Sequence, residues 1–287
     1  MIPESELILN TKGNVYHLDL APEQIADDVI IVGDPDRVKM VSSFFDSVEF
    51  ENHNREFFSS TGLFNGKRIT VISSGIGTDN IDILLNELDA LKNIDLKTRE
   101  IKSELSSLNI VRIGTSGSLR REIQPGDVVV SSYAIGIDGL LNFYDLDKND
   151  EPNQHLKENL EWHPEFNRPY MVKGSQKLID QLSRGYQQGI TVTANGFYAP
   201  QGREIRLKNR KSNFLDALKS YSYQQIPVTN LEMETSGLYG LSKLLGHEAC
   251  TVCLILAGRT SHKFQVDYHG KMKDLIQEIL IRLTSGY

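Results

Sequence analysis

Short apolar runs alternate with longer amphipathic stretches along this 287-residue chain, and this alternation restricts its fold more than any other feature. Six apolar runs predict strands over residues 29–32, 68–73, 110–113, 127–131, 191–194 and 249–256. The stretches between them predict helices over residues 37–45, 80–92, 175–188, 213–222, 235–245 and 271–283. The pattern predicts an α/β fold in which helices cover a sheet, and the length favours a single domain over residues 1–287.

Two segments interrupt this alternation. Residues 93–109 form a charged insertion, for which we expect a surface hairpin or an extra helical turn. Residues 141–169 are polar and contain Trp162, the only tryptophan. Connections of this length are functional more often than short ones.

Charge and composition exclude several classes of function. The formal net charge of -7 argues against a nucleic-acid partner, although a local group of arginines could still bind a small anion. Apolar stretches fall short of the roughly 18 residues of a membrane span, and the acidic start does not resemble a signal peptide. Cys250 and Cys253 lie in an apolar run, so we expect buried structural thiols in a cytoplasmic protein.

The sequence GDPDRV at residues 33–38 directly follows a predicted strand. Gly33 lets a backbone N–H approach an anion closely, and the following helix directs its positive end to the same place. Arg37 falls in the first helical turn, where a cation is unfavourable unless an anion is bound. This turn therefore favours a phosphate site, although Gly-Asp-Pro is also a common connection between a strand and a helix.

The sequence VRIGTSG at residues 111–117 ends another predicted strand. Arg112 interrupts an apolar run, so its buried charge needs either an anionic ligand or a carboxylate in a purely structural pair. Thr115 follows at the carboxyl end of the sheet, where ligands bind in open α/β folds. A third turn, SSGIGTDN at residues 73–80, lacks the last glycine of a dinucleotide-binding motif and argues against NAD.

The sequence FYAPQGR at residues 197–203 suits a flat heterocycle. Phe197 supplies an aromatic ring, Gln201 both a donor and an acceptor, and Arg203 donors only. The O2, N3–H and O4 groups of uracil could satisfy this pair. In isolation, the same residues would form an ordinary surface loop.

The sequence NLEMETS at residues 230–236 precedes a predicted helix. Glu234 is placed to accept hydrogen bonds from the vicinal hydroxyls of a sugar. The alternative is helix capping, with Asn230 or Thr235 as the cap and the glutamates in the favourable first turn.

Taken together and in this order, the five motifs resemble the nucleoside phosphorylase family, and its uridine-cleaving members most closely. The resemblance extends from Tyr16 to Thr260. It implies a three-layer αβα sandwich around a mixed, partly barrel-like central sheet. It also implies a homo-oligomer, either a dimer or a hexamer, with active sites shared between subunits.

The resemblance also implies a role for each site residue. The phosphate site comprises Gly33, Arg37, Arg112 and Thr115, with Arg55 from a neighbouring subunit; the ribose site comprises Met233 and Glu234, with His17 from that neighbour; the base site comprises Phe197, Gln201 and Arg203. Inorganic phosphate is the implied co-substrate, without an organic cofactor. A monovalent cation such as K⁺ is implied near Glu56, Ile76 and Asn80, and Arg259 is expected to steady the base-binding loop.

The implied reaction is the phosphorolysis of uridine to uracil and ribose 1-phosphate. Purine-cleaving relatives carry an aspartate after the strand that here ends in residues 256–260, and this chain has no carboxylate there. The alternatives are a purine nucleoside phosphorylase, a nucleosidase that uses water, and a non-catalytic nucleoside-binding protein. Asp79 departs from the family pattern in the third turn, as does the insertion at residues 93–109.

Overall fold

The computed structural model describes residues 1–210, 213–259, 263–264 and 268–285. Within these residues, one mixed sheet contains strands β1 (Asp28–Val32), β2 (Ser47–Asn54), β3 (Phe57–Phe64), β4 (Lys67–Ser73), β7 (Asn109–Ser118), β8 (Val128–Gly136), β9 (Tyr170–Lys173), β10 (Gln187–Thr193), β11 (Ser222–Tyr223), β12 (Ile226–Glu232), β13 (Glu248–Gly258) and β14 (Lys263–Phe264). The helices are α1 (Pro35–Ser42), α2 (Thr78–Asn93), α3 (Glu151–Asn159), α4 (Gln176–Leu182), α5 (Phe214–Ser220), α6 (Thr235–Leu245) and α7 (His269–Thr284).

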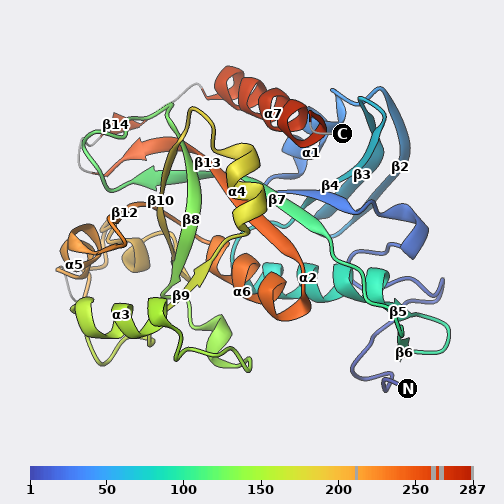
Figure 1. Cartoon of the computed structure of the whole chain (residues 1–287), viewed down its shortest axis with the longest axis horizontal. Helices are drawn as coiled ribbons and strands as arrows, with labels where there is room; N and C mark the ends of the chain where they lie inside the picture. Colours follow the sequence, from blue (N-terminus) through green and yellow to red (C-terminus); the bar gives the residue numbers. More distant parts are fainter. Residues whose placement is uncertain (211–212, 260–262, 265–267, 286–287) are drawn as a thin grey trace.

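The sheet closes on itself over part of its width. Its strand order is β11-β12-β10-β8-β13-β7-β1-β4-β3-β2, and β12 also pairs with β7, where Asn230 faces Ser118. The five strands β7, β13, β8, β10 and β12 therefore form a barrel, and the remaining strands extend from it as an open sheet (Figure 1). This confirms the expected mixed, partly barrel-like sheet.

Helices cover both faces of the sheet, which confirms the three-layer arrangement (Figure 1). On one face, α2 and α6 pack against the sheet through a core that includes Leu84, Leu88 and Leu238. On the other face, α1, α4 and α7 enclose a second core that includes Val38 and Ile276. The apolar stripes of the amphipathic helices thus supply both cores, as the sequence predicts.

Each strand and helix predicted from an apolar run is present, but one helix is shorter than predicted. The helix expected over residues 175–188 ends at Leu182, and β10 begins at Gln187. Gly185 separates them with a φ of +79°, a backbone conformation that a continuing helix cannot contain. The charged insertion forms the expected hairpin, between β5 (Ile94–Asp95) and β6 (Glu100–Ile101).

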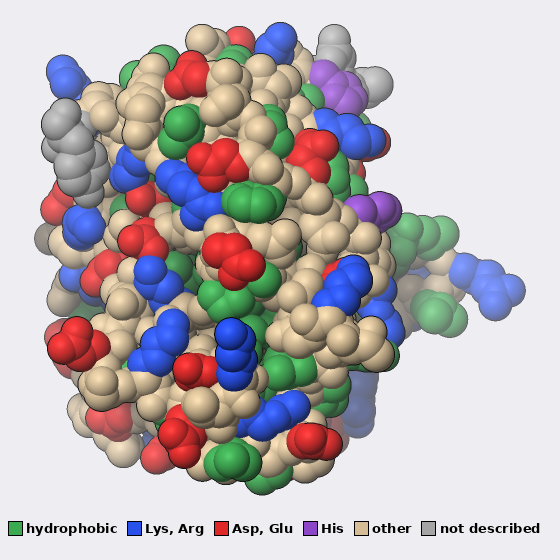
Figure 2. Space-filling view, turned by 90° about the vertical axis from the view of Figure 1, so that its right-hand side faces the viewer, with side chains coloured by type: hydrophobic (Ala, Val, Ile, Leu, Met, Phe, Trp, Pro, Cys, Tyr) green, Lys and Arg blue, Asp and Glu red, His purple; other side chains and the backbone are tan. Residues whose placement is uncertain are grey.

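Charged side chains of both signs are mixed on one face of the molecule (Figure 2). Figure 2 shows the face that carries the β2–β3 end of the sheet, where acidic and basic side chains are interspersed rather than gathered into a basic stripe. Among the described residues, every helix is too short or too polar to cross a bilayer. Cys250 and Cys253 are buried and free, as predicted.

Candidate active site

A cavity of about 630 Å³ opens where the carboxyl ends of several strands meet. Parallel pairing of β1 with β4 and β7 places the loops that follow β1 and β4 beside the end of β7, and β12 reaches the same place through its pairing with β7. The cavity is lined by nine of the expected site residues, Gly33, Arg37, Arg112, Thr115, Phe197, Gln201, Arg203, Met233 and Glu234, and by Ile76. Its volume lies within the range of small-molecule sites.

Arg37 enters the cavity from the first turn of α1. Asp34 caps this helix by accepting from the N–H of Asp36, and Pro35 occupies its first position. The Arg37 guanidinium is buried and donates to the carbonyl of Ile113 at 3.3 Å. Burial lowers the pKa of Arg37, and the charge of nearby Arg112 lowers it further. Arg37 and Arg112 thus bring two guanidinium groups to the same cavity.

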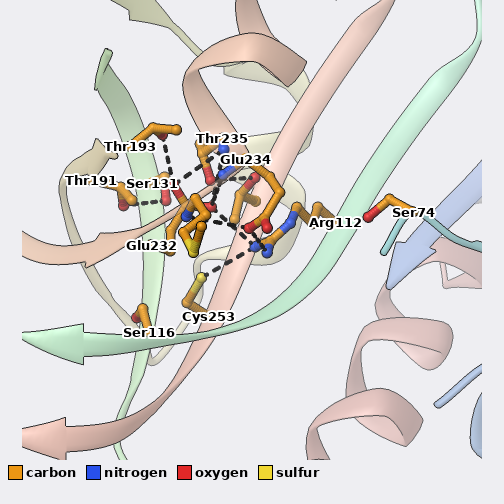
Figure 3. Close-up of polar contacts among 12 residues, drawn as sticks. Ser74, Arg112, Ser116, Ser131, Thr191, Thr193, Glu232, Glu234, Thr235 and Cys253 are labelled. Carbon is orange, nitrogen blue, oxygen red and sulfur yellow. Dashed lines mark hydrogen bonds and ion pairs between the residues drawn. The ribbon is translucent and has the colours of Figure 1, made fainter. Parts of the chain in front are cut away.

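Arg112 lies in the middle of β7, with 4% of its surface exposed. Its Nη1 atom lies 3.3 Å from Oε2 of Glu232, and its Nη2 atom pairs with Oε2 of Glu234 (Figure 3). Burial alone lowers the pKa of Arg112, but the two carboxylates outweigh it and raise the pKa above its ordinary value. Among the described residues, the Nε atom is buried without a hydrogen-bond partner, so the guanidinium retains a donor for a further acceptor.

Gly114 makes room for this guanidinium. A Cβ atom at Gly114 would lie 2.0 Å from Nη1 of Arg112, too close for any side chain. Gly114 lies inside β7, and a side chain at this position would push the guanidinium away from its two carboxylates. The glycine allows the buried charge to lie directly against the backbone of its own strand.

The structure corrects the capping interpretation of residues 230–236. Glu232 ends β12, and Glu234 is the N-cap residue of α6 but makes no side-chain cap hydrogen bond. Its Oε1 instead accepts from the N–H of Gly77 at 2.9 Å, and its Oε2 pairs with Arg112. The side chain of Glu234 is thus directed to the cavity rather than to the helix end.

Glu232 is a site residue that the sequence reasoning missed. It accepts from the Thr193 hydroxyl at 2.6 Å and from the backbone N–H groups of Glu234 and Thr235, in addition to pairing with Arg112 (Figure 3). Burial raises its pKa, and the charge of Arg112 opposes this shift. Arg112, which the sequence predicts to be buried in β7, needs a partner of opposite charge. That need was the signal for a carboxylate such as Glu232 on the neighbouring strand β12.

The base-binding residues lie on the loop after β10. Gln201 is buried and ends the 3-10 turn η3 (Ala199–Gln201). Its Oε1 accepts from Arg203 at 2.6 Å, and the Arg203 guanidinium lies 3.8 Å from the centre of the Phe197 ring. Burial lowers the pKa of Arg203 to about 10. Arg259 donates to the carbonyl of Gln201 at 2.9 Å, the contact expected of a residue that steadies this loop.

The two residues expected from a neighbouring subunit do not line this cavity. Arg55 adopts a φ of 56°, and its guanidinium lies 5.6 Å from the centre of the Tyr16 ring. His17 follows Tyr16 and pairs with Glu87 on α2. His17 and Arg55 thus belong to one patch of surface, joined through Tyr16.

The expected cation-binding residues lie around Gly75. Asn80 donates to the carbonyl of Ile76 at 3.5 Å, and a Cβ atom at Gly75 would contact both Asn80 and Glu56. Among the described residues, no group of three or more His, Cys, Asp or Glu side chains could hold a metal ion. Thr260, at the end of the resemblance, lies outside the described residues.

Comparisons with known proteins agree with this geometry. The family model of the phosphorylase superfamily matches residues 27–285. The chain is 27% identical over 256 residues to a uridine phosphorylase of Thermococcus kodakarensis, covering 88% of this chain and 80% of that protein. It is 25% identical over 267 residues to a DeoD-type purine nucleoside phosphorylase of Bacillus velezensis, covering 90% and 96%.

A solved structure is also similar over nearly the whole chain. It is the crystal structure of a Trypanosoma brucei nucleoside phosphorylase, described as showing uridine phosphorylase activity. The two chains superpose with a TM-score of 0.89 at 29% identity, covering 97% of this chain and 99% of the other.

Proposed function

The chain belongs to the phosphorylase superfamily, and we propose that within it the protein cleaves a pyrimidine nucleoside with inorganic phosphate. The reaction converts uridine and phosphate to uracil and ribose 1-phosphate. One observation carries the proposal: two buried arginines, the buried carboxylate of Glu234 and the Gln201–Arg203 pair converge on one cavity.

Arg37 and Arg112 bind the phosphate. The forked guanidinium matches phosphate oxygens in a way that the single point charge of lysine does not. The free Nε–H of Arg112 supplies one donor beyond those that face the carboxylates. The N–H of Gly33 and the hydroxyl of Thr115 line the same end of the cavity.

Glu234 and Met233 hold the ribose, so that C1′ faces a phosphate oxygen in line with the bond that breaks. The C1′–N1 bond breaks while a phosphate oxygen bonds to C1′. The electron pair of the broken C1′–N1 bond leaves with the base, which takes up at N1 the proton that the hydrogen phosphate gives up. The sugar acquires oxocarbenium character, which the negative charge of bound phosphate stabilises. No covalent bond to the enzyme forms.

Gln201 and Arg203 stabilise the departing base. Arg203 donates to the Gln201 amide oxygen, which fixes the amide so that its NH₂ group faces outward as a donor. Together the two side chains supply donors to the carbonyl oxygens, where negative charge develops on uracil. The absence of a carboxylate in residues 256–260 favours a pyrimidine over a purine.

We also propose that each active site is completed by His17 and Arg55 of a neighbouring subunit, in a dimer or a hexamer. The support is that both residues lie together on a patch away from their own cavity. Arg55→Ala should lose phosphate affinity, and mixing it with Arg112→Ala should restore some complete sites by subunit exchange. If labelled subunits exchange and no activity returns, the sites are not shared.

Two finer features complete the proposal. A monovalent cation such as K⁺ binds between subunits near Glu56, Ile76 and Asn80, which already lie around Gly75. The enzyme acts in the cytoplasm, a reducing compartment that suits its two free thiols.

The function is tested by incubating the purified protein with uridine, thymidine, inosine and adenosine, with and without phosphate. Chromatography of the released base is the measurement. We expect uracil from uridine only when phosphate is present. Release of a purine base in preference to uracil would establish a purine nucleoside phosphorylase. Release of a base without phosphate would establish a nucleosidase. Binding of uridine without any released base would identify a non-catalytic nucleoside-binding protein.

A further inference from the structure

The segment that carries His17 is held by a single carboxylate on α2. Glu87 accepts from the backbone N–H of His17 with both oxygens at 3.0 Å, and from that of Leu18 at 2.8 Å. The same carboxylate contacts Nδ1 of the His17 ring at 2.6 Å. The Glu87 side chain is 14% exposed, so most of it is enclosed by this segment and the helix.

These contacts determine which way the imidazole ring presents its nitrogens. Because both oxygens of Glu87 already accept backbone N–H groups, the carboxylate acts as an acceptor, and Nδ1 of His17 must donate its proton to it. Nε2 is then the acceptor nitrogen of the neutral ring. Within the described part of the chain, no hydrogen bond to Nε2 is present, and the side chain is 28% exposed.

Two further contacts hold His17, one through its backbone and one through its ring. Asn54 donates to the carbonyl of His17 at 2.8 Å, and the edge of the Tyr16 ring meets the imidazole with centroids 5.0 Å apart. Tyr16 in turn contacts Arg55. The ring is therefore oriented before any substrate binds.

The same helix explains why His17 does not line its own cavity. Helix α2 begins at Thr78, next to the Gly77 N–H that contacts Glu234, and Glu87 lies nine residues further along. At 1.5 Å per residue, this places Glu87 roughly 14 Å from the cavity end of the helix. One end of α2 thus lies at its own cavity, and its middle supports His17, which the proposed function assigns to a neighbour's site.

We propose that Glu87 is a positioning residue that fixes His17 with Nδ1–H toward its carboxylate, so that Nε2 accepts a hydrogen bond from a sugar hydroxyl of the nucleoside. This proposal rests on the proposed function, because it assigns His17 to the ribose. Carboxylate–histidine pairs orient the ring in the same way in metal sites.

The test is a double-mutant cycle on uridine phosphorolysis by the full oligomer. Glu87→Gln replaces one acceptor oxygen with an NH₂ group that opposes the donors of residues 17 and 18. We expect the KM for uridine to rise about tenfold while the KM for phosphate changes less than twofold. In a His17→Ala background, Glu87→Gln should add less than twofold.

Asp95→Asn is the matched control, because Asp95 also accepts two backbone N–H groups, from Lys97 and Thr98, but lies on the distant β5–β6 hairpin. It should leave both KM values unchanged. An equal effect of Glu87→Gln with and without His17, or equal effects on both KM values, would show that Glu87 serves only the fold.

A second measurement does not depend on variants that fold or turn over. Nitrogen-15 NMR of the histidine rings in the wild-type protein, with the His17 signals assigned by their loss in His17→Ala, reports which nitrogen carries the proton. We expect protonated Nδ1, and a neutral ring protonated only at Nε2 would overturn the proposal. A wild-type enzyme that releases no uracil would contradict the proposed function instead. The NMR spectrum would still show which nitrogen of His17 carries the proton.

Discussion

The two ends of the cavity are built differently. At the sheet end, which comprises Arg37, Arg112, Glu232 and Glu234, every charged side chain is buried and bonded to a strand or to a group at a helix start. At the loop end, which comprises Phe197, Gln201 and Arg203, the Phe197 ring is 51% exposed, and the contacts join residues of one short loop.

This difference separates the common chemistry from the choice of substrate. Phosphate and ribose are shared by every substrate of a nucleoside phosphorylase, and the sheet fixes the groups that we propose bind them. The base varies, and a loop on a rigid scaffold can change without disturbing the sheet. Relatives named for uridine and for purine nucleosides match 88% and 90% of this chain.

Arg112→Ala should have the largest effect on the sheet end. It leaves Glu232 and Glu234 as two uncompensated buried charges, which lowers the free energy of unfolding by about 3–5 kcal/mol. Activity should fall roughly a thousandfold as phosphate binding is lost. Denaturant unfolding and steady-state kinetics measure both, with the exposed Arg121→Ala as the control. An Arg112→Ala protein of wild-type stability would contradict the buried pairing.

Phosphate should stabilise the folded protein by about 2.7 kcal/mol at a hundredfold excess over its Kd. Chloride at matched ionic strength should do much less, because it cannot accept several forked hydrogen bonds. Arg112→Lys keeps the charge and should lose much of this stabilisation. Melting temperatures measure the effect, and an unchanged phosphate response in Arg112→Lys would assign the arginine to its carboxylates alone.

At the loop end, Gln201→Ala or Arg203→Ala should lower kcat/KM for uridine roughly tenfold to a hundredfold and leave the fold intact. Each change leaves polar groups of the base unpaired. Ile205→Ala, on the same loop and 77% exposed, is the control. Unchanged kcat/KM in both variants would exclude this loop as the base site. A large fall in the melting temperature of either variant would show that the loop end, like the sheet end, supports the fold.

Cys253 gives the smallest expected effect. Burial raises the pKa of this thiol to about 12, against about 8.5 in an unfolded chain. Because the folded pKa is the higher one, the stabilisation is complete below pH 8.5 and is lost as the pH rises toward 12. Wild type should therefore lose roughly 1 kcal/mol more stability than Cys253→Ala between pH 7 and pH 9. The free energy of unfolding of both proteins, measured with denaturant between pH 7 and pH 9, tests this prediction. An equal dependence on pH in wild type and Cys253→Ala would refute the raised pKa of Cys253.

The sequence predicted the fold where one periodicity dominates. Buried strands such as β1 and β13 are continuous apolar runs, and α2 carries a clear helical stripe. The edge strand β2 was missed because its residues are mostly exposed and polar, so no apolar run marks it. The end of α4 was misplaced because the polar residues that precede the apolar part of β10 carry no periodicity that separates helix from strand. The helix ends at Leu182, ahead of Gly185 with its positive φ, and β10 begins at Gln187.

The site was predictable where a residue is out of place in its local sequence. Arg112 in an apolar strand and Arg37 at a helix start are such residues, and both line the cavity. Glu232 and Glu87 give no such signal. Their partners lie 120 and 70 residues away from them in the sequence, and only the folded chain brings them together.

The central claim is that phosphate, rather than water, attacks the sugar of a pyrimidine nucleoside in this cavity. Phosphorus-31 NMR of the wild-type protein with uridine and inorganic phosphate tests it directly, with uracil quantified in the same sample. We predict one ribose 1-phosphate formed for each uracil released, with both absent in Arg112→Ala. Uracil accompanied by free ribose, with the phosphate signal unchanged, would contradict the account.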